Sequence, residues 1–158
     1  MIGWRVGWVA GPADLIESVG WTHVYNTTMP TALARFPAAA VLRGDQGHVA
    51  DCVADLEARR DLILDALAGW PVIRPGGGWS LLIDAIELGT TPAELSQMLL
   101  ADAAIAATPM LGWGGDVADR HVRLVFSAES RERLATIPER FAGTRLEAYG
   151  SSPRTAPA

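Results

Sequence analysis

Two arginines stand alone among apolar residues in segments that the sequence predicts to be strands. Arg5 is the single charge in residues 4–10, and Arg123 lies between Val122 and Leu124. A guanidinium presents a planar fork of N–H donors, which suits a structural ion pair and also suits a ligand phosphate or carboxylate. The residue pattern alone favours the ion pair for Arg5 and leaves both interpretations open for Arg123.

The other side chains that could carry chemistry form weaker patterns. His23, His48 and His121 share no metal-ligand spacing, so surface or packing roles are favoured and no metal site is expected. The single cysteine, Cys52, excludes an intramolecular disulfide and a cysteine-rich metal site, and its apolar helical neighbours predict that it is buried. Glycines 76–78 are not followed by Lys-Ser or a helix start, which favours a hairpin or bulge over a phosphate loop.

The composition is that of a globular protein and argues against two classes of partner. The chain has 158 residues, 49% hydrophobic and 20% charged, enough for one domain or for a small domain plus part of another. A net charge of −5 without a basic cluster argues against nucleic-acid binding. No apolar run reaches the roughly 18 residues of a membrane span. The chain also begins without the apolar stretch of a signal peptide, so a cytoplasmic location is expected.

Hydrophobic periodicity predicts a mixed α/β fold, in which a small mixed sheet is covered by helices. A capping box at Thr91–Glu94 opens one helix, and Pro138 is expected to kink the last one. Trp79 and Trp113 are expected to lie in the core rather than at a site. The expected strands span residues 4–10, 72–73, 79–83, 104–107 and 121–126. Besides the helix that Thr91 opens, the expected helices span residues 13–19, 31–42, 46–67 and 131–141.

Four short motifs follow one another along the chain. They are Gly3-Trp4-Arg5-Val6-Gly7 with Gly11-Pro12, the polar run Asn26-Thr27-Thr28-Met29-Pro30, Gly76-Gly77-Gly78-Trp79, and Val122-Arg123-Leu124-Val125-Phe126-Ser127. The motifs, their order and their spacing resemble those of the class I/II aminotransferases. These are fold-type-I enzymes that depend on pyridoxal 5'-phosphate (PLP). Each motif alone is weak, but together they extend to about residue 143, and residues 144–158 have no clear counterpart.

The resemblance implies a binding role for both arginines. Arg5 matches the family's arginine that binds the cofactor phosphate. Arg123 matches the arginine that binds the substrate α-carboxylate, where a bidentate contact orients the amino acid for reaction. With the family match, these anion-binding roles are favoured over structural ion pairs.

The resemblance also implies contacts across a homodimer. In the family, the polar turn reaches the active site of the neighbouring subunit, which makes Asn26, Thr27 and Thr28 candidate site residues. His23 precedes this turn and is a further candidate, for contact with the substrate side chain across the dimer.

Two departures from the family pattern concern catalysis and loop shape. The lysine that forms the Schiff base with PLP lies a few residues before Gly-Trp-Arg, whereas this chain begins at Met1 and contains no lysine. The partners of the cofactor ring would lie further upstream. We therefore expect no catalytic residue, no covalent PLP and no turnover in the isolated chain. Pro109-Met110 stands where the family has Pro-Gly, which leaves the shape of the next loop open.

The resemblance divides the chain into a remnant of the large PLP-binding domain (1–45), a small C-terminal domain (46–143) and a loose tail (144–158). The expected function is that of a truncated aminotransferase, which transfers an amino group between an amino acid and a 2-oxo acid. It would act as a homodimer or together with a missing N-terminal portion. The alternative is a non-catalytic remnant or binding module that keeps the small-domain fold. The motifs do not identify the amino acid.

Overall fold

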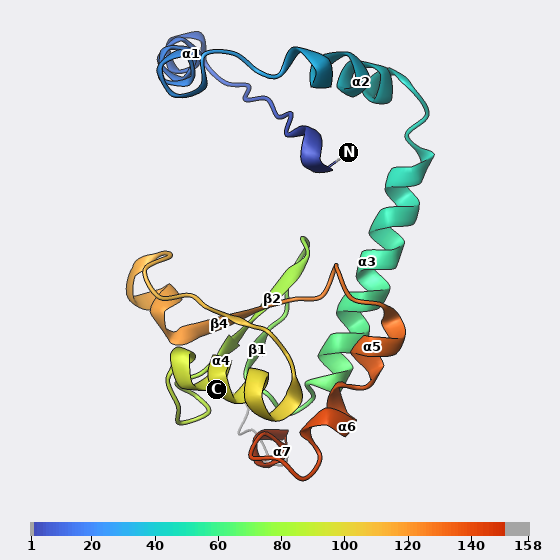
Figure 1. Ribbon diagram of the computed structural model, residues 1–158, viewed down its shortest axis with the longest axis vertical. Coiled ribbons are helices and arrows are strands. Elements are labelled where there is room, and N and C mark those ends of the chain that lie inside the picture. The colour runs from blue at the N-terminus through green and yellow to red at the C-terminus, as the bar shows by residue number, and fades with distance from the viewer. Residues whose placement is uncertain (1, 151–158) are drawn as a thin grey trace. The chain divides into compact units, whose positions relative to one another are not determined.

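The computed structural model describes residues 2–150, and these form two compact units that meet in sequence between Asp51 and Cys52 (Figure 1). The helices are η1 (Ile2–Trp4), α1 (Ala13–Thr27), α2 (Ala32–Arg43), α3 (Gly47–Ala66), α4 (Pro92–Ala103), η2 (Gly115–Arg120), α5 (Arg131–Ala135), α6 (Ile137–Phe141) and α7 (Glu147–Gly150). The strands are β1 (Val72–Ile73), β2 (Ser80–Asp84), β3 (Thr108–Pro109) and β4 (His121–Val125).

The first unit contains helices and no described strand, so the prediction of a buried strand at residues 4–10 is wrong. Residues 5–12 follow η1 without regular structure, and residues 4–10 are exposed. A strand forms when another strand accepts its backbone hydrogen bonds. All the strand pairings among the described residues involve β1 to β4 of the second unit, so nothing pairs with this segment in a ladder.

Helix α1 is longer than the sequence predicts. It passes residue 19 and includes His23, Asn26 and Thr27, so the first two residues of the expected polar turn are helical. The Thr27 hydroxyl donates to the His23 carbonyl one turn earlier, at 3.2 Å, which allows this polar residue to remain in the helix. The helix ends at Thr28, whose φ of 64° is left-handed.

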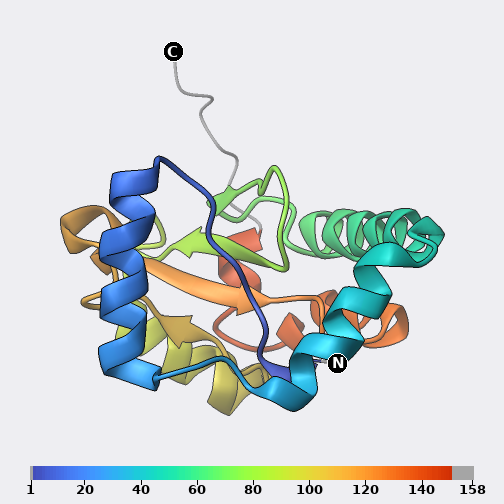
Figure 2. The same cartoon turned by 90° about the horizontal axis from the view of Figure 1, so that it is seen from above.

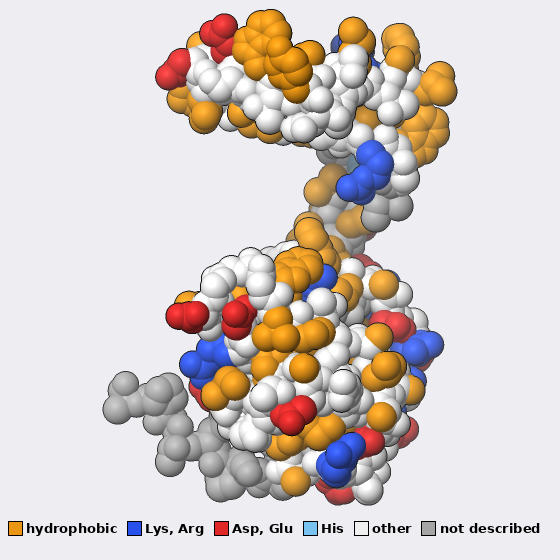
Figure 3. Space-filling view, turned by 60° about the vertical axis from the view of Figure 1, so that its left-hand side comes forward, with side chains coloured by type: hydrophobic (Ala, Val, Ile, Leu, Met, Phe, Trp, Pro, Cys, Tyr) orange, Lys and Arg blue, Asp and Glu red, His pale blue; other side chains and the backbone are white. Residues whose placement is uncertain are grey.

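The first unit has almost no core. Of residues 3–51, for which burial is described, Ala34 alone is buried, while Phe36 on the same helix is 80% exposed. Apolar side chains are displayed on the surface of this unit (Figure 3). A unit of this size needs a buried apolar interior to be stable. We therefore expect its apolar side chains to be covered by other protein surface.

The second unit is built on a four-stranded sheet in the order β1-β2-β4-β3, in which every pairing is antiparallel (Figure 2). Strands β1 and β2 form the hairpin expected around glycines 76–78. In the β2–β4 register, Leu81 lies opposite Leu124, and Ile83 opposite Val122. Because side chains alternate across a pleated strand, these four share one face, and all four are buried. This face is the sheet's contribution to the core.

Helices α3 to α6, with Leu67 directly after α3, complete this core; the helical residues are Ile63, Leu95, Leu99, Leu134, Ile137 and Phe141. Helix α4 begins with the predicted capping box, in which the Thr91 hydroxyl accepts from the Glu94 N–H at 3.2 Å and Glu94 accepts from the Thr91 N–H at 3.0 Å. In α3, Arg59 Nε pairs with Asp55 Oδ2, one helical turn earlier, at 2.7 Å. A hydrogen bond from Arg131, together with Arg59, holds the pKa of Asp55 below its usual value.

Two predictions for the second unit, a strand at residues 104–107 and a kinked last helix, differ from the structure. The short strand predicted at residues 104–107 is instead β3, Thr108–Pro109, paired with Arg123 and Val122. The last helix is not a single kinked helix but two, α5 and α6, with Pro138 in the first turn of α6. Proline is favoured there because the first helical N–H groups have no partner within the helix. Pro138 therefore begins a helix rather than bending one.

Three further predictions of burial or order differ from the structure. Residues 144–150 belong to the folded unit rather than to a loose tail, because Leu146 is fully buried and the Tyr149 ring meets the Trp70 ring edge-on at 5.5 Å. The remaining tail residues, 151–158, lie outside the described residues. Cys52 is exposed, as are Trp79 and Trp113, at 61% and 58%. Cys52 lies near the start of α3, which extends beyond the core, and the apolar periodicity of the sequence does not show where the core ends.

Candidate functional site

Arg123 lies at the centre of β4, on the sheet face that is turned away from the core. Its backbone neighbours are Leu82 in β2 and Thr108 in β3. The flanking side chains of Val122 and Leu124 point into the core, with 0% and 5% exposure. The alternation of the strand therefore places Arg123 on the opposite face, and strands on both sides fix its backbone position.

The Arg123 guanidinium is held by packing and keeps an unused donor. Its Nε atom is buried and makes no hydrogen bond with any described residue. The guanidinium carbon lies 4.8 Å from the centre of the Trp113 ring. A cation over an indole face is attracted electrostatically without using its N–H donors. Trp113 thus contacts the guanidinium without occupying its N–H donors.

The loop before β4 positions Trp113. The Met110 N–H donates to the His121 carbonyl at 3.0 Å, and the Gly112 N–H donates to Asp119 Oδ1 at 2.7 Å. Gly112 has a φ of 75°, a left-handed conformation that glycine adopts without strain. These bonds close the loop although Met110 replaces the family's glycine. The sequence does not predict the shape of this loop. It therefore does not predict the contact between Trp113 and Arg123, which depends on that shape.

A buried polar cluster anchors the start of β4. Asp84 Oδ2 accepts from Arg120 Nε at 2.6 Å, and Asp84 Oδ1 accepts from the N–H groups of Ile86 and Glu87 at 3.0 and 3.1 Å. Asp84 is 7% exposed. His121 is also buried, and its Nδ1 lies 2.7 Å from the Val117 carbonyl, so that nitrogen carries the proton. The cluster fixes the strand two residues before Arg123.

Three of the other candidate residues line one cavity in the first unit. Arg5, His23 and Thr27 border a hollow of about 670 Å³ between residues 5–9 and α1. Arg5 has a φ of 50°, which is rare for a residue other than glycine. The Thr27 hydroxyl lies 2.9 Å from His23 Nδ1, so these two side chains form one polar surface.

The remaining candidates lie at the end of α1. Asn26 borders a second, shallower hollow that it shares with His23 and Thr27. Thr28 ends the helix, and its N–H donates to the Val24 carbonyl at 3.0 Å. The structure thus groups Arg5 with His23 and Thr27 and places Asn26 beside them, while Arg123 belongs to the other compact unit.

Within residues 2–150, no three or more His, Cys, Asp or Glu side chains are placed to hold a metal ion. Over the same residues, no helix is both long enough and apolar enough to cross a bilayer.

Comparison with known proteins identifies the family. A sequence profile of the family "Aminotransferase class I and II" matches residues 1–141. The aspartate aminotransferase of Geobacillus stearothermophilus is 33% identical over 148 residues, which cover 89% of this chain and 37% of that enzyme. The aspartate/prephenate aminotransferase of Thermus thermophilus is 32% identical, with coverage of 90% and 37%.

Solved structures show the same fold. An aromatic aminotransferase from Pyrococcus horikoshii superposes with a TM-score of 0.76 at 28% identity, covering 89% of this chain and 38% of that one. A tetra mutant of Thermus thermophilus aspartate aminotransferase gives 0.75 at 30% identity, covering 90% and 39%. The fold is therefore that of the fold-type-I aminotransferases, as the sequence predicts.

The chain belongs to the class I and II aminotransferase family. It spans about 37% of the length of the curated relatives that it matches. Membership of this family implies PLP as the cofactor of the parent enzymes.

Proposed function

We propose that this chain supplies the C-terminal part of a PLP-dependent aminotransferase, in which Arg123 binds the α-carboxylate of the amino acid or 2-oxo acid. The observation that carries this proposal is the buried Nε of Arg123, which has no hydrogen-bond partner among the described residues. A buried donor without a partner costs about 1–3 kcal/mol. A carboxylate that accepts from the guanidinium edge removes this cost and neutralises the charge.

The surroundings of Arg123 suit this role better than a structural ion pair. Its guanidinium lies over the face of the Trp113 ring, and no carboxylate of the described residues forms an ion pair with it. The nearby Asp84 is already bonded to Arg120 and to two backbone N–H groups. A bound substrate carboxylate would therefore be the acceptor that this part of the sheet otherwise lacks.

For Arg5 we propose contact with the cofactor phosphate. Arg5 borders the same cavity as Thr27 and His23, and a guanidinium, a hydroxyl and an imidazole are donors that fit a phosphate dianion. When bound, PLP supplies the electron sink that transamination requires. This chain's residues would hold the phosphate and orient the substrate. They would not supply the covalent attachment, because the chain contains no lysine.

The remaining roles follow the family pattern. We propose that Asn26, Thr27 and Thr28 contact the active site of a neighbouring subunit in a homodimer, and that His23 contacts the substrate side chain there. Residues 1–45 would belong to the large domain and residues 46–143 to the small domain. The exposed apolar surface of the first unit supports assembly with further protein. A cytoplasmic location is proposed with the same function.

A chimera tests this function. The chain replaces the matching C-terminal segment of the Geobacillus stearothermophilus aspartate aminotransferase, whose remaining part supplies the upstream residues. We expect the chimera to retain PLP through gel filtration and to transaminate amino acids, while the isolated chain shows no turnover. A folded chimera that retains PLP but converts no amino acid would favour the alternative, a non-catalytic binding module with the small-domain fold.

A further inference from the structure

A further cavity lies in the second unit, on the helix-covered side of the sheet. Its volume is about 250 Å³, and its apolar walls are formed by Ile63, Leu124, Leu134 and Ile137 together with residues 104–106. Leu124 borders this cavity, whereas Arg123, its neighbour, points to the other face of the sheet. The cavity is therefore separate from the proposed substrate carboxylate site.

Two arginines border this cavity, and each is fixed by part of its guanidinium. Arg133 Nε pairs with Glu129 Oε2 at 2.8 Å. Arg140 Nε donates to the Thr136 hydroxyl at 3.2 Å, and Arg140 Nη1 donates to the Ala103 carbonyl at 3.3 Å. These bonds hold both side chains in place without using all of their donors.

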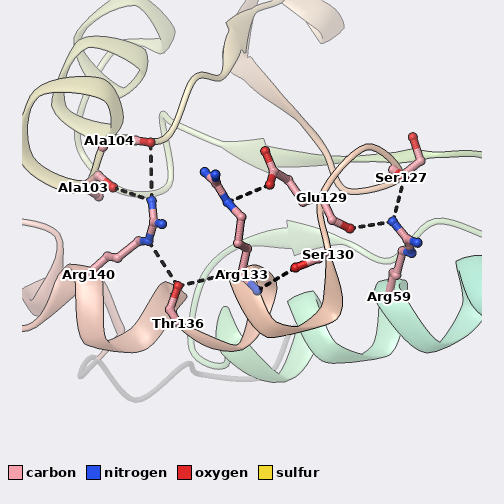
Figure 4. A network of polar contacts seen from close by, with 9 residues as sticks. All are labelled: Arg59, Ala103, Ala104, Ser127, Glu129, Ser130, Arg133, Thr136 and Arg140. Carbon is pink, nitrogen blue, oxygen red and sulfur yellow. Dashed lines mark hydrogen bonds and ion pairs between the residues drawn. The ribbon is translucent and has the colours of Figure 1, made fainter.

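Each of the two guanidinium groups keeps terminal N–H donors beside the cavity. Figure 4 draws no contact to the two terminal nitrogens of Arg133 or to Nη2 of Arg140, and both residues border the cavity. No described residue accepts a hydrogen bond from these atoms. Glu129 also borders the cavity, but Arg133 already pairs with its carboxylate, so the two arginines leave the rim positive.

We infer that this cavity binds a small monocarboxylic acid with a branched apolar tail. The two guanidinium groups would bind the carboxylate through charge-assisted hydrogen bonds. The tail would enter the space between Ile63, Leu134 and Ile137 and displace water from apolar walls. A volume of about 250 Å³ lies below the roughly 300–1,000 Å³ of sites for drug-sized ligands, which restricts the ligand to a short acid.

Calorimetric titration of the full chain with 4-methylpentanoate tests this inference. Acetate carries the charge without the tail, and 4-methylpentanamide carries the tail without the charge, so both should bind at least about tenfold more weakly. Arg133→Gln removes donors at an exposed position that should not disturb folding, and it should weaken 4-methylpentanoate binding roughly tenfold. Arg74→Gln removes an equally exposed arginine that does not border the cavity, and it should change the affinity less than about twofold.

Arg123→Gln distinguishes this cavity from the proposed substrate site. We expect it to leave 4-methylpentanoate binding unchanged. If Arg123→Gln abolishes binding and Arg133→Gln does not, the acid binds at Arg123; the inference is then overturned while the proposed function is supported. Absence of saturable binding, or equal binding of 4-methylpentanoate and its amide, would also overturn the inference and would leave the role of Arg123 unaffected.

Discussion

Replacing Asp84 should destabilise the second unit, because this carboxylate satisfies two backbone donors in the turn after β2 and the Arg120 guanidinium before β4. Asp84→Ala leaves the N–H groups of Ile86 and Glu87 without their side-chain acceptor and separates Arg120 from its partner. Each partly buried backbone donor should cost about 1 kcal/mol. Arg120 is 42% exposed and can be rehydrated, so its loss should add only about 1 kcal/mol. The expected total is about 3 kcal/mol.

Asp84→Asn separates the charge from the backbone contacts. The amide oxygen can still accept from Ile86 and Glu87, so the cost should be about 1 kcal/mol, mostly from the weaker bond to Arg120. Urea unfolding of the chain, followed by circular dichroism at several protein concentrations, measures both values and separates folding from association. A cost below about 1 kcal/mol for the alanine variant, or equal costs for the two variants, would refute this account.

Three further predictions concern assembly, acid and the indole. The full chain should self-associate or unfold readily, because its first unit exposes apolar side chains. Residues 46–150 alone should remain monomeric in sedimentation experiments. A full chain that sediments as a single monomeric species and melts cooperatively would count against this. Arg131 and Arg59 lower the pKa of Asp55, and the Thr91 hydroxyl and backbone N–H lower that of Glu94. Both carboxylates therefore stabilise the fold above their usual pKa values of 3.8 and 4.5, and this stability is lost as the pH falls through the lower folded-state values. Asp55→Asn should flatten the fall in urea midpoint over that range, and an unchanged slope would contradict the assignment. In the chimera, Trp113→Ala should lower kcat/KM for amino acids about fivefold by releasing the guanidinium, and Trp113→Phe should restore most of it; equal losses in both variants would exclude a role for the ring face.

Features that depend on neighbours in sequence were predictable. The capping box at Thr91–Glu94 and the pair Asp55–Arg59 need only three- and four-residue spacings, and both form. The alternation around Arg123 also placed it on a strand with the apolar residues on the opposite face. Each of these features depends on the spacing of residues that are close in the sequence, so it can be predicted from the sequence alone.

Features that depend on distant partners were not predictable. Residues 4–10 have the composition of a buried strand, but a strand also requires a neighbour, and none of the described strands pairs with them. The stacking of Trp113 on Arg123 depends on how the loop after Pro109 closes. Leu146 appeared to belong to a tail, because its burial comes from residues far away in sequence.

The most direct test of the account compares one amino acid with its decarboxylated amine in the chimera. Arg123→Ala should leave the spectrum of bound PLP nearly intact and lower kcat/KM for the amino acid. The loss of a charge-assisted bidentate contact costs on the order of 2–5 kcal/mol, or roughly 30- to 4,000-fold. The amine never makes this contact and should be affected far less, and Arg123→Lys should recover only part of the loss. Arg5→Ala serves as the matched control, because it should weaken PLP retention and slow both substrates alike. If Arg123→Ala slows the amino acid and the amine equally, or removes the cofactor, then Arg123 does not bind the substrate carboxylate.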